Sequence, residues 1–349
     1  MISTASDIVA SPAAPHRVTL RKTVVSCAML AVTLLLSIVA LSLIGSESLP
    51  STASLCALAS FGTSPCGLTQ DQFDILFQIR LPRLLLAAAV GGSLATAGAG
   101  YQALLRNPLA EPYLLGISNG AAVGTMVALM FFGANEWTRP LLAFTGALVA
   151  TLAVYRLARG RAGATPERLI LAGVIVTTFL SSVIVFVTTL MDATRIRSFT
   201  FWLLGDLSGT STTLLPVTIS VAVAGAVALT LNARSLNLLM LGERDAFDLG
   251  VEVGRVRIVV FVVASLLVGS AVAASGSVGY VGLVVPHLAR LSLGSDNRIS
   301  IPAAALGGAL FVIVADTVAR TIIAPRELPV GAITALIGAP LFIYLLKRA

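Results

Sequence analysis

Charged residues are scarce in this chain: only 11% of its 349 residues are Asp, Glu, Lys or Arg, whereas 57% are hydrophobic. About a quarter of the residues are charged in a typical soluble domain, so this composition does not suit one. The mean hydropathy of +0.96 indicates a lipid bilayer as the main solvent. There every backbone amide must be paired internally, which allows helices or a closed barrel. The apolar runs are about 20 residues long and do not alternate, so we expect an all-α integral membrane protein.

The groups that ATP hydrolysis, metal binding and ion coupling need are also missing. Neither of the two lysines, Lys22 and Lys347, follows the glycine-rich loop that holds phosphates in a Walker A motif. The two histidines, His16 and His287, are far apart and have no cluster of metal ligands around them. Ion-coupled carriers usually place carboxylates near the midplane, but here Asp316 is the nearest to membrane depth. We therefore expect no catalytic centre, no metal site and no cofactor bound by this chain.

The basic residues occur in small groups between apolar runs, so the net charge of +7 does not indicate nucleic-acid binding. Uncharged runs occupy 23–44, 84–105, 113–133, 140–155, 169–191, 207–233, 258–289, 299–315 and 328–346. The run 258–289 is too long for one span, and its small residues at 274–279 predict a break. With ten spans and the N-terminus inside, 16 of the 23 Lys and Arg residues are cytoplasmic and 7 are outside. A single span over 258–289 gives 14 against 9, so ten transmembrane helices with both ends inside are favoured.

No boundary of a soluble domain is visible. The first apolar run is longer than the core of a cleavable signal peptide, and the residues before it are polar. We expect a disordered cytoplasmic tail over 1–22 and one ten-helix transmembrane domain over 23–349. The hexapeptides 90–95 and 268–273 resemble each other and would lie on helices that cross in opposite directions. That pattern is typical of an inverted repeat, although small residues at helix contacts also recur by chance.

Several motifs at the ends of the apolar runs match one known family. QIRLPR stands at 78–83, and RNPLAEP at 106–112 is followed by LLGISNGA at 114–121. Farther along come LGE at 241–243, GYVGLVVPH at 279–287, ADTVAR at 315–320 and ELPVG at 327–331. In this spacing, over roughly 75–349, they resemble the FecCD/vitamin B12 type permease family of ABC importers. The earlier part of the chain matches that family only in having one span and an outer loop.

The resemblance implies a docking role for Arg80, Arg83 and Arg320, which would form salt bridges to glutamates of an external substrate-binding protein. Arginine suits that task because its planar guanidinium can hold a carboxylate through two hydrogen bonds. The residues alone also allow another interpretation, in which arginines at the start of a span extend to the membrane interface without a partner.

The segment 234–257 is the largest cytoplasmic loop of the ten-span arrangement, and it is rich in charge. The resemblance implies that it holds a short coupling helix, seated in a groove of an ATPase subunit. The residues assigned to it are Leu241, Gly242, Glu243, Arg244, Asp245, Ala246, Phe247, Leu249 and Gly250. The glycines would serve as turn or close-approach positions. The alternative is a solvated connector.

Three further segments connect the runs. Thr165, Pro166 and Glu167 correspond by resemblance to the inner gate of the transport pathway, although extra residues set this loop apart from the vitamin B12 permeases. RNPLAEP is expected to turn at the cytoplasmic surface, because residues before proline disfavour helix. Cys56 and Cys66 lie ten residues apart in the outer loop, where they would form a disulfide in an oxidising compartment or remain two partly buried thiols.

The resemblance thus implies the permease subunit of an ABC importer in the inner (cytoplasmic) membrane, surrounded by lipid and working as a homodimer. Its partners would be two ATPase subunits, which hold the ATP and Mg²⁺, and a periplasmic or lipid-anchored binding protein. The implied cargo is an iron chelate, either a ferric siderophore or haem, with cobalamin as the alternative. An ion-coupled secondary transporter is a more remote alternative, which would require carboxylates at membrane depth.

Overall fold

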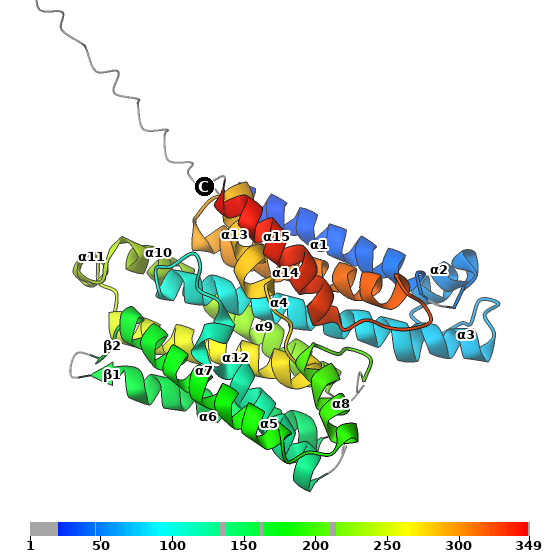
Figure 1. Ribbon diagram of the computed structural model, residues 1–349. Helices are drawn as coiled ribbons and strands as arrows, with labels where there is room; N and C mark the ends of the chain where they lie inside the picture. The colour runs from blue at the N-terminus through cyan, green and yellow to red at the C-terminus, as the bar shows by residue number, and fades with distance from the viewer. Residues whose placement is uncertain (1–19, 46, 133–136, 161–162, 210–213, 348–349) are drawn as a thin grey trace, which may run out of the picture.

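The structure is a computed structural model that describes residues 20–45, 47–132, 137–160, 163–209 and 214–347. Of the predicted tail 1–22, residues 1–19 lie outside the described part of the chain. Residues 20–22 belong to the first turn of α1 (Leu20–Ser42), so this helix starts before the uncharged run. The helices form a bundle with most long axes roughly aligned, and the connections lie at its two ends (Figure 1).

Six helical segments are long and apolar enough to cross a bilayer. One of them is a continuous helix made of α3 (Gln70–Asp74), η1 (Ile75–Arg80) and α4 (Leu81–Leu104). The other five are α1, α6 (Thr138–Ala158), α7 (Pro166–Thr188), α12 (Val253–Ser275) and α14 (Asn297–Thr321). A bent pair, α9 (Leu215–Leu231) and α10 (Ala233–Leu241), passes the same test with a 51° angle. Three apolar helices are shorter: α5 (Ile117–Phe131), α13 (Val281–Leu293) and α15 (Val330–Leu346). The chain is an all-α multispan membrane protein, and the count of ten spans stays a prediction.

Short elements mark the two ends of the bundle (Figure 1). One end carries α2 (Ser51–Ala59) and α3, and we call it the outer end after the predicted orientation. The opposite, inner end carries α11 (Glu243–Asp248) and a small antiparallel hairpin of β1 (Arg159–Gly160) and β2 (Gly163–Ala164), which the sequence did not predict. Two more short helices, η2 (Pro112–Leu115) and α8 (Ala193–Leu203), complete the described elements.

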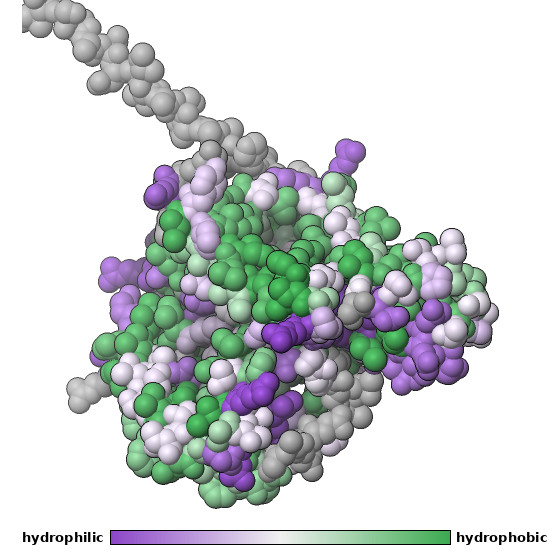
Figure 2. Space-filling view, turned by 45° about the vertical axis from the view of Figure 1, so that its right-hand side comes forward, coloured by the Kyte–Doolittle hydropathy of each residue, from purple (hydrophilic) through white to green (hydrophobic). Residues whose placement is uncertain are grey.

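The surface of the bundle is apolar along its length. Figure 2 shows hydrophobic residues over the middle of one face and hydrophilic residues gathered at the outer end. Large apolar side chains on the outside of the bundle are exposed, among them Leu35 of α1 at 63% and Phe179 of α7 at 66%. Water would not tolerate so many exposed apolar residues, whereas hydrocarbon does.

The centre of the bundle is α4, which packs against α9, α12, α13 and α14. Its glycines allow backbones to meet: a Cβ at Gly91 would overlap the carbonyl oxygen of Gly308 in α14, and one at Gly98 would overlap that of Gly282 in α13. Close approach through small residues is how helices associate in lipid, where burying apolar side chains against one another gains little.

Two long helices are each followed by a short helix that starts after a break. α12 ends at Ser275 and α13 starts at Val281, so the predicted break in 258–289 lies at 276–280. In the same way α4 is followed by η2 and then α5. The residue before each short helix is left-handed, with φ of 73° at Gly116 and 67° at Tyr280. The two similar hexapeptides lie within α4 and α12, as an inverted repeat predicts, and the repeat itself stays a prediction.

Candidate functional site

The three predicted docking arginines converge at the outer end although Arg320 lies far along the chain from the others. They line one small cavity of about 160 Å³, together with Glu47, Ile75, Ile79 and Glu327. All three are nearly buried, with exposed fractions of 4% for Arg80, 8% for Arg83 and 7% for Arg320. A binding partner would therefore meet these guanidinium groups only at the mouth of the cavity.

Arg83 is held between two carboxylates. Its Nε lies 3.1 Å from both carboxylate oxygens of Asp316, and its Nη2 lies 2.9 Å from Oδ1 of the same residue. Its Nη1 donates to Oε2 of Glu327 at 2.8 Å. The Asp316 side chain is fully buried, whereas that of Glu327 is 45% exposed. Asp316 is therefore the interior partner of Arg83, and Glu327 covers it from the side of the cavity mouth.

The other two arginines tie the end of α1 to the cluster. Arg320 donates through Nη2 to the carbonyl oxygen of Leu41 at 3.1 Å, and Arg80 donates to that of Ser42 at 3.1 Å. The Nε of Arg320 is 3.7 Å from Oδ2 of Asp316 and has no hydrogen-bond partner among the described residues. The alternative interpretation supposed that these arginines extend to the membrane interface without a partner. Instead, the guanidinium groups are nearly buried and have partners within the protein. Their docking role stays a prediction.

The predicted coupling segment forms two short helices at the inner end. α10 and α11 meet at Gly242, whose φ of 140° favours glycine, and Gly250 with φ of 83° ends the turn after α11. α11 projects from the end of the bundle (Figure 1). The segment around it presents three exposed apolar side chains: Leu241 at the end of α10 is 66% exposed, Phe247 of α11 is 72% exposed, and Leu249, the C-cap of α11, is 60% exposed. Exposed apolar groups on a projecting helix are typical of a protein contact.

The remaining residues of this segment hold it to the bundle. Glu243 forms an ion pair with Arg257 of α12, and the side chain of Ala246 is fully buried. Arg244 and Asp245 are exposed. Glu243 and Ala246 thus hold one side of the segment to the bundle, and the other side is exposed. The coupling role stays a prediction.

A polar contact also joins α10 to the start of α14. Asp296 is the N-cap of α14, and its Oδ1 accepts a hydrogen bond from Nδ2 of Asn237 at 2.7 Å. The backbone N–H of Asn297 donates to Oδ1 of Asn237 at 2.9 Å. Burial opposes ionisation of Asp296, but hydrogen bonds from Arg298 and Asn237 outweigh it and lower the pKa of this carboxyl to about 2. The cap is therefore charged at any physiological pH.

The predicted gate residues lie beside the hairpin. Thr165 is the N-cap of α7, Pro166 is its first residue, and Glu167 is exposed in its first turn. Arg106 and Arg257 are close enough to Glu167 to interact with it electrostatically. The gate loop therefore lies at the inner end, within electrostatic range of the connection after α4 and of the arginine that pairs with Glu243. The gate role itself stays a prediction.

The prolines of the connection after α4 predicted a turn at the cytoplasmic surface. The structure differs, because this connection does not stay at that surface. Pro112 lies against Gly282 of α13, which in turn packs on Leu94 and Gly98 of α4. Those two residues lie roughly 9–15 Å along α4 from its end at Leu104. After Ala110 the chain therefore runs back into the bundle, and α5 starts inside it. This return explains why α5 is shorter than a full span.

Inside the bundle the returning chain meets the break between α12 and α13. Oε1 of Glu111 accepts a hydrogen bond from the backbone N–H of Tyr280 at 3.2 Å, at the N-terminus of α13. The hydroxyl of Tyr113 donates to the carbonyl oxygen of Val278 at 2.8 Å and accepts from its N–H at 2.9 Å. Helix termini leave unpaired backbone groups that hydrocarbon cannot satisfy. These side chains satisfy several of them, and the Glu111 carboxylate also suits the positive end of the helix dipole.

The sequence did not predict either of these interior carboxylate roles. Glu111 was placed in a surface turn, and Asp316 at the outer end of its helix without a partner. A signal was present for Asp316, because its four-residue spacing from Arg320 puts both side chains on one helix face. For Glu111 the signal was weak, since the polar residues that open the run 113–133 only hint at a late helix start.

The outer loop is also tied together. Cys56 of α2 and Cys66 are joined by a disulfide, which leaves Cys27 of α1 as the free cysteine of the described residues. Around the bridge a small apolar core forms from Leu49, Ala57, Leu68 and Leu76. The cavity with the three arginines therefore borders a compact cap rather than an open loop.

The chain is similar to known proteins over most of its length. The FecCD transport family matches residues 29–348 of the chain. The hemin transport system permease protein HmuU of Yersinia pestis is 40% identical over 309 residues, which cover 85% of this chain and 91% of the relative. The cobalamin import system permease protein BtuC of Halobacterium salinarum is 42% identical over 281 residues, covering 80% and 75%.

A solved structure agrees with these relatives. A metal-chelate type ABC transporter in an inward-facing conformation superposes with a TM-score of 0.80 at 30% identity, covering 94% of this chain and 100% of that one. The chain belongs to the FecCD transport family. It is a multispan permease subunit of the ABC type and not an enzyme, because ATP hydrolysis in such transporters is carried out by separate ATPase subunits.

The unequal burial of the two Arg83 partners leads to a prediction. Replacing Asp316 with alanine leaves a buried guanidinium without its main partner, so we expect a loss of about 3–5 kcal/mol in the free energy of unfolding. Replacing the half-exposed Glu327 with alanine should cost only about 0–1 kcal/mol. Thermal unfolding of the purified variants in detergent measures both. Equal losses would mean that Asp316 is not the main partner of Arg83.

Proposed function

We propose that this chain forms the membrane pathway of an ATP-driven importer for a metal chelate, either a ferric siderophore or haem. The observation that carries this proposal is the likeness to a metal-chelate type ABC transporter over nearly the whole chain. The relative named as a hemin permease supports an iron-containing cargo, and the relative named as a cobalamin permease keeps cobalamin as the alternative. An ion-coupled mechanism is disfavoured, since Glu111 and Asp316, two carboxylates that the described residues place inside the bundle, are bonded to protein groups.

We also propose the assembly in which the chain works. Two copies would line the pathway between them, because a cargo as large as a metal chelate suits a space between subunits better than a pocket within one. Exposed apolar faces on α7 and α15, such as Phe179 at 66% and Leu336 at 71%, are available for that contact. Two ATPase subunits would bind ATP and Mg²⁺ at the inner end. The complex would lie in the inner membrane with both chain termini in the cytoplasm.

Transport in a purified system tests this function. Proteoliposomes that contain the chain and its ATPase subunits should take up the ligand of the binding protein only with ATP, and ionophores should leave uptake unchanged. Uptake that ionophores abolish while ATP is present would contradict the proposal. The visible spectrum of the ligand retained by the binding protein then separates the cargoes: a Soret band indicates haem, a corrin spectrum cobalamin, and a ferric charge-transfer band a siderophore.

Docking of the binding protein is proposed at the outer cavity. Because Arg83 already pairs with Glu327 at the cavity mouth, an incoming carboxylate would have to take the place of that glutamate. Arg80 and Arg320 donate to backbone carbonyl groups, which are weaker partners than a carboxylate, so they can strengthen their bonding when a carboxylate enters. Glu327 therefore acts as an internal competitor for the proposed partner.

Replacing Glu327 with glutamine should tighten binding of the substrate-binding protein by about two- to fivefold, because Arg83 loses a partly exposed competitor. Arg80→Gln should weaken the same binding. Asp71→Asn is the matched control, since Asp71 is an exposed carboxylate of α3 at the same end of the bundle. Surface plasmon resonance on the permease in nanodiscs measures these affinities. If Glu327→Gln binds no better than Asp71→Asn, the competitor role is wrong, and Arg80→Gln still reports on the docking site.

Coupling to the ATPase is proposed at α11. Its exposed apolar residues lie next to charged ones on a helix that Gly242 and Gly250 set apart from the bundle. The ion pair between Glu243 and Arg257 connects this helix to α12, and through α12 to the break at 276–280. A movement of α11 imposed by an ATPase would therefore reach the middle of the bundle through a rigid helix.

Replacing Phe247 with aspartate should weaken association with the ATPase roughly thirtyfold, because an exposed aromatic residue on a projecting helix is suited to be an anchor of the contact. Deletion of residues 243–249 should abolish it. Phe61→Asp is the control, because Phe61 is a phenylalanine at the outer end that is 92% exposed. Co-purification with the tagged ATPase and ATP-dependent uptake are the measurements. Normal assembly of the Phe247 variant would exclude α11 as the main contact.

A further inference from the structure

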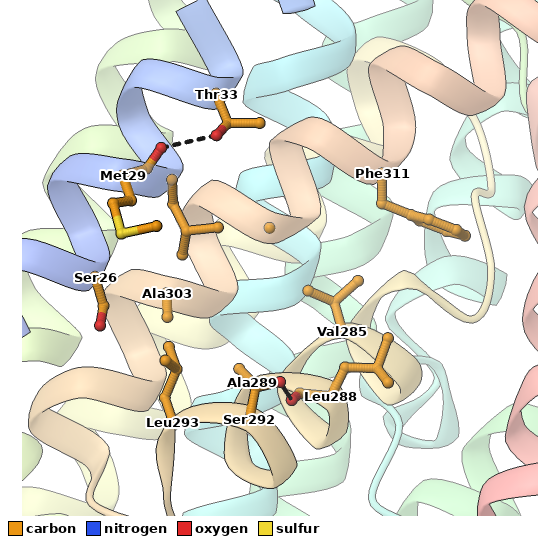
Figure 3. Close-up of a pocket in the computed structure, with 12 residues that line it drawn as sticks. Ser26, Met29, Thr33, Val285, Leu288, Ala289, Ser292, Leu293, Ala303 and Phe311 are labelled. Carbon is orange, nitrogen blue, oxygen red and sulfur yellow. Dashed lines mark hydrogen bonds between the residues drawn. The ribbon is translucent and has the colours of Figure 1, made fainter.

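An apolar groove of about 390 Å³ runs along the bundle between α1, α13 and α14 (Figure 3). α1 and α13 each pack along α14 and touch each other far less. α14 therefore forms the floor of the groove and the other two helices form its walls. The groove is deep at Ala303 and Gly307, which lie one helical turn apart, because alanine has only a methyl group and glycine has no side chain.

The walls offer hydrocarbon rather than polar groups. Positions 26, 29, 30 and 33 of α1 and 285, 288, 289 and 292 of α13 line the groove, each set with the spacing of one helix face. The hydroxyls of Thr33 and Ser292 donate to the carbonyl oxygens of Met29 and Leu288 on their own helices, as the dashed lines in Figure 3 show. A polar ligand would find little to bond along these walls.

The groove lies at the depth of the bilayer core. Its α1 wall belongs to a helix that is long and apolar enough to span a bilayer and whose apolar stretch is not buried in the protein. Met29, which lines the groove, is itself 66% exposed. At this depth the space must be filled by lipid chains or by another protein surface, because the bilayer core contains no water.

Positive charge stands at one end of the groove. Lys22 lies one turn before Ser26 on the same face of α1, and its Nζ donates to the carbonyl oxygen of Leu293 at 3.0 Å. Leu293 also lines the groove, so the ammonium group lies at the groove end. Arg21 beside it is exposed. Both cations precede the uncharged run of α1, which places them at the level of the lipid headgroups.

We propose that this groove binds an anionic glycerophospholipid, with one acyl chain along the walls and the phosphate beside Lys22 and Arg21. The bond to Leu293 places the ammonium group of Lys22 at the groove end, where its positive charge attracts a phosphate. A second copy of the chain is a poorer occupant. In a twofold dimer with its axis along the membrane normal, the same residues face each other at the same depth, so the cations of the two copies would be brought together.

The test uses the full chain with its native lipid removed, in nanodiscs of phosphatidylcholine alone or of phosphatidylcholine with phosphatidylglycerol. After extraction, native mass spectrometry counts the lipids that stay bound. We expect the wild-type chain to retain phosphatidylglycerol, and Lys22→Gln to weaken this retention about fivefold, the effect of one cation near a membrane surface. Ala289→Phe fills the groove from α13 and should also release the lipid.

Matched controls separate the groove from general effects. Lys347→Gln removes the chain's other lysine, at the end of α15, and Ala31→Phe adds a phenylalanine on α1 outside the groove lining. Both should retain phosphatidylglycerol like the wild type.

The proposal is overturned if Lys22→Gln behaves like Lys347→Gln, or if phosphatidylcholine is retained equally well. It is also overturned if Ala289→Phe keeps the lipid and instead disrupts the dimer, which would make a second copy the occupant. Should Ala289→Phe not fold, the two lysine variants decide alone.

Discussion

The close approach of α4 to its neighbours is the constraint on which the rest of the bundle depends. Lipid tails are as apolar as leucine, so helices in a membrane gain stability from tight contact and hydrogen bonds rather than from leaving water. Gly91 and Gly98 provide that contact by removing the side chains that would separate α4 from α14 and α13. The outer cavity and the inner end both depend on this contact, because Arg83 lies in the first turn of α4 and Arg106 lies just beyond the last turn of the same helix.

The same helix also stabilises the breaks that a membrane protein would otherwise not tolerate. Gln102 of α4 donates to the carbonyl oxygen of Gly282 at 3.3 Å and accepts from Arg290, so α13 is held at both its start and its end. From the other side Glu111 bonds to the N–H that precedes α13. The two interrupted helices thus complete each other's hydrogen bonding, and irregular backbone is tolerated because it is buried in protein rather than in lipid.

Much of this fold could be predicted from the sequence because hydrocarbon imposes simple rules. The apolar runs correspond to the described helices, and the small residues at 274–279 located the break after α12 to within a few residues. The family motifs located the outer arginines and the coupling segment. What a linear sequence could not provide was pairing across the bundle. Arg83 meets Asp316 and Glu327 from more than 230 positions away, and no local pattern encodes that contact.

A related limit explains why Glu111 was missed. A proline-rich connection after a span is indistinguishable by composition from a surface turn, and the return of this one into the bundle depends on the space that Gly282 leaves for Pro112. Helix boundaries shifted for a simpler reason. α1 includes Lys22, and α7 starts at Pro166, because a charged residue within the first turn of a span can still reach the headgroups.

The pairing at the outer end sets the energetics of any contact made there. An arginine without a partner in a nearly buried cavity would be destabilised by the loss of its hydration, and a carboxylate that paired with it would bind very tightly. Asp316 and Glu327 prevent this state, because Arg83 is paired before a partner arrives. In the proposed docking, a carboxylate that replaced Glu327 would break one ion pair of Arg83 for the one that it forms, so the net gain at Arg83 would be small and would favour reversible association. Reversible association is what a delivery protein needs if it is to leave after each cycle.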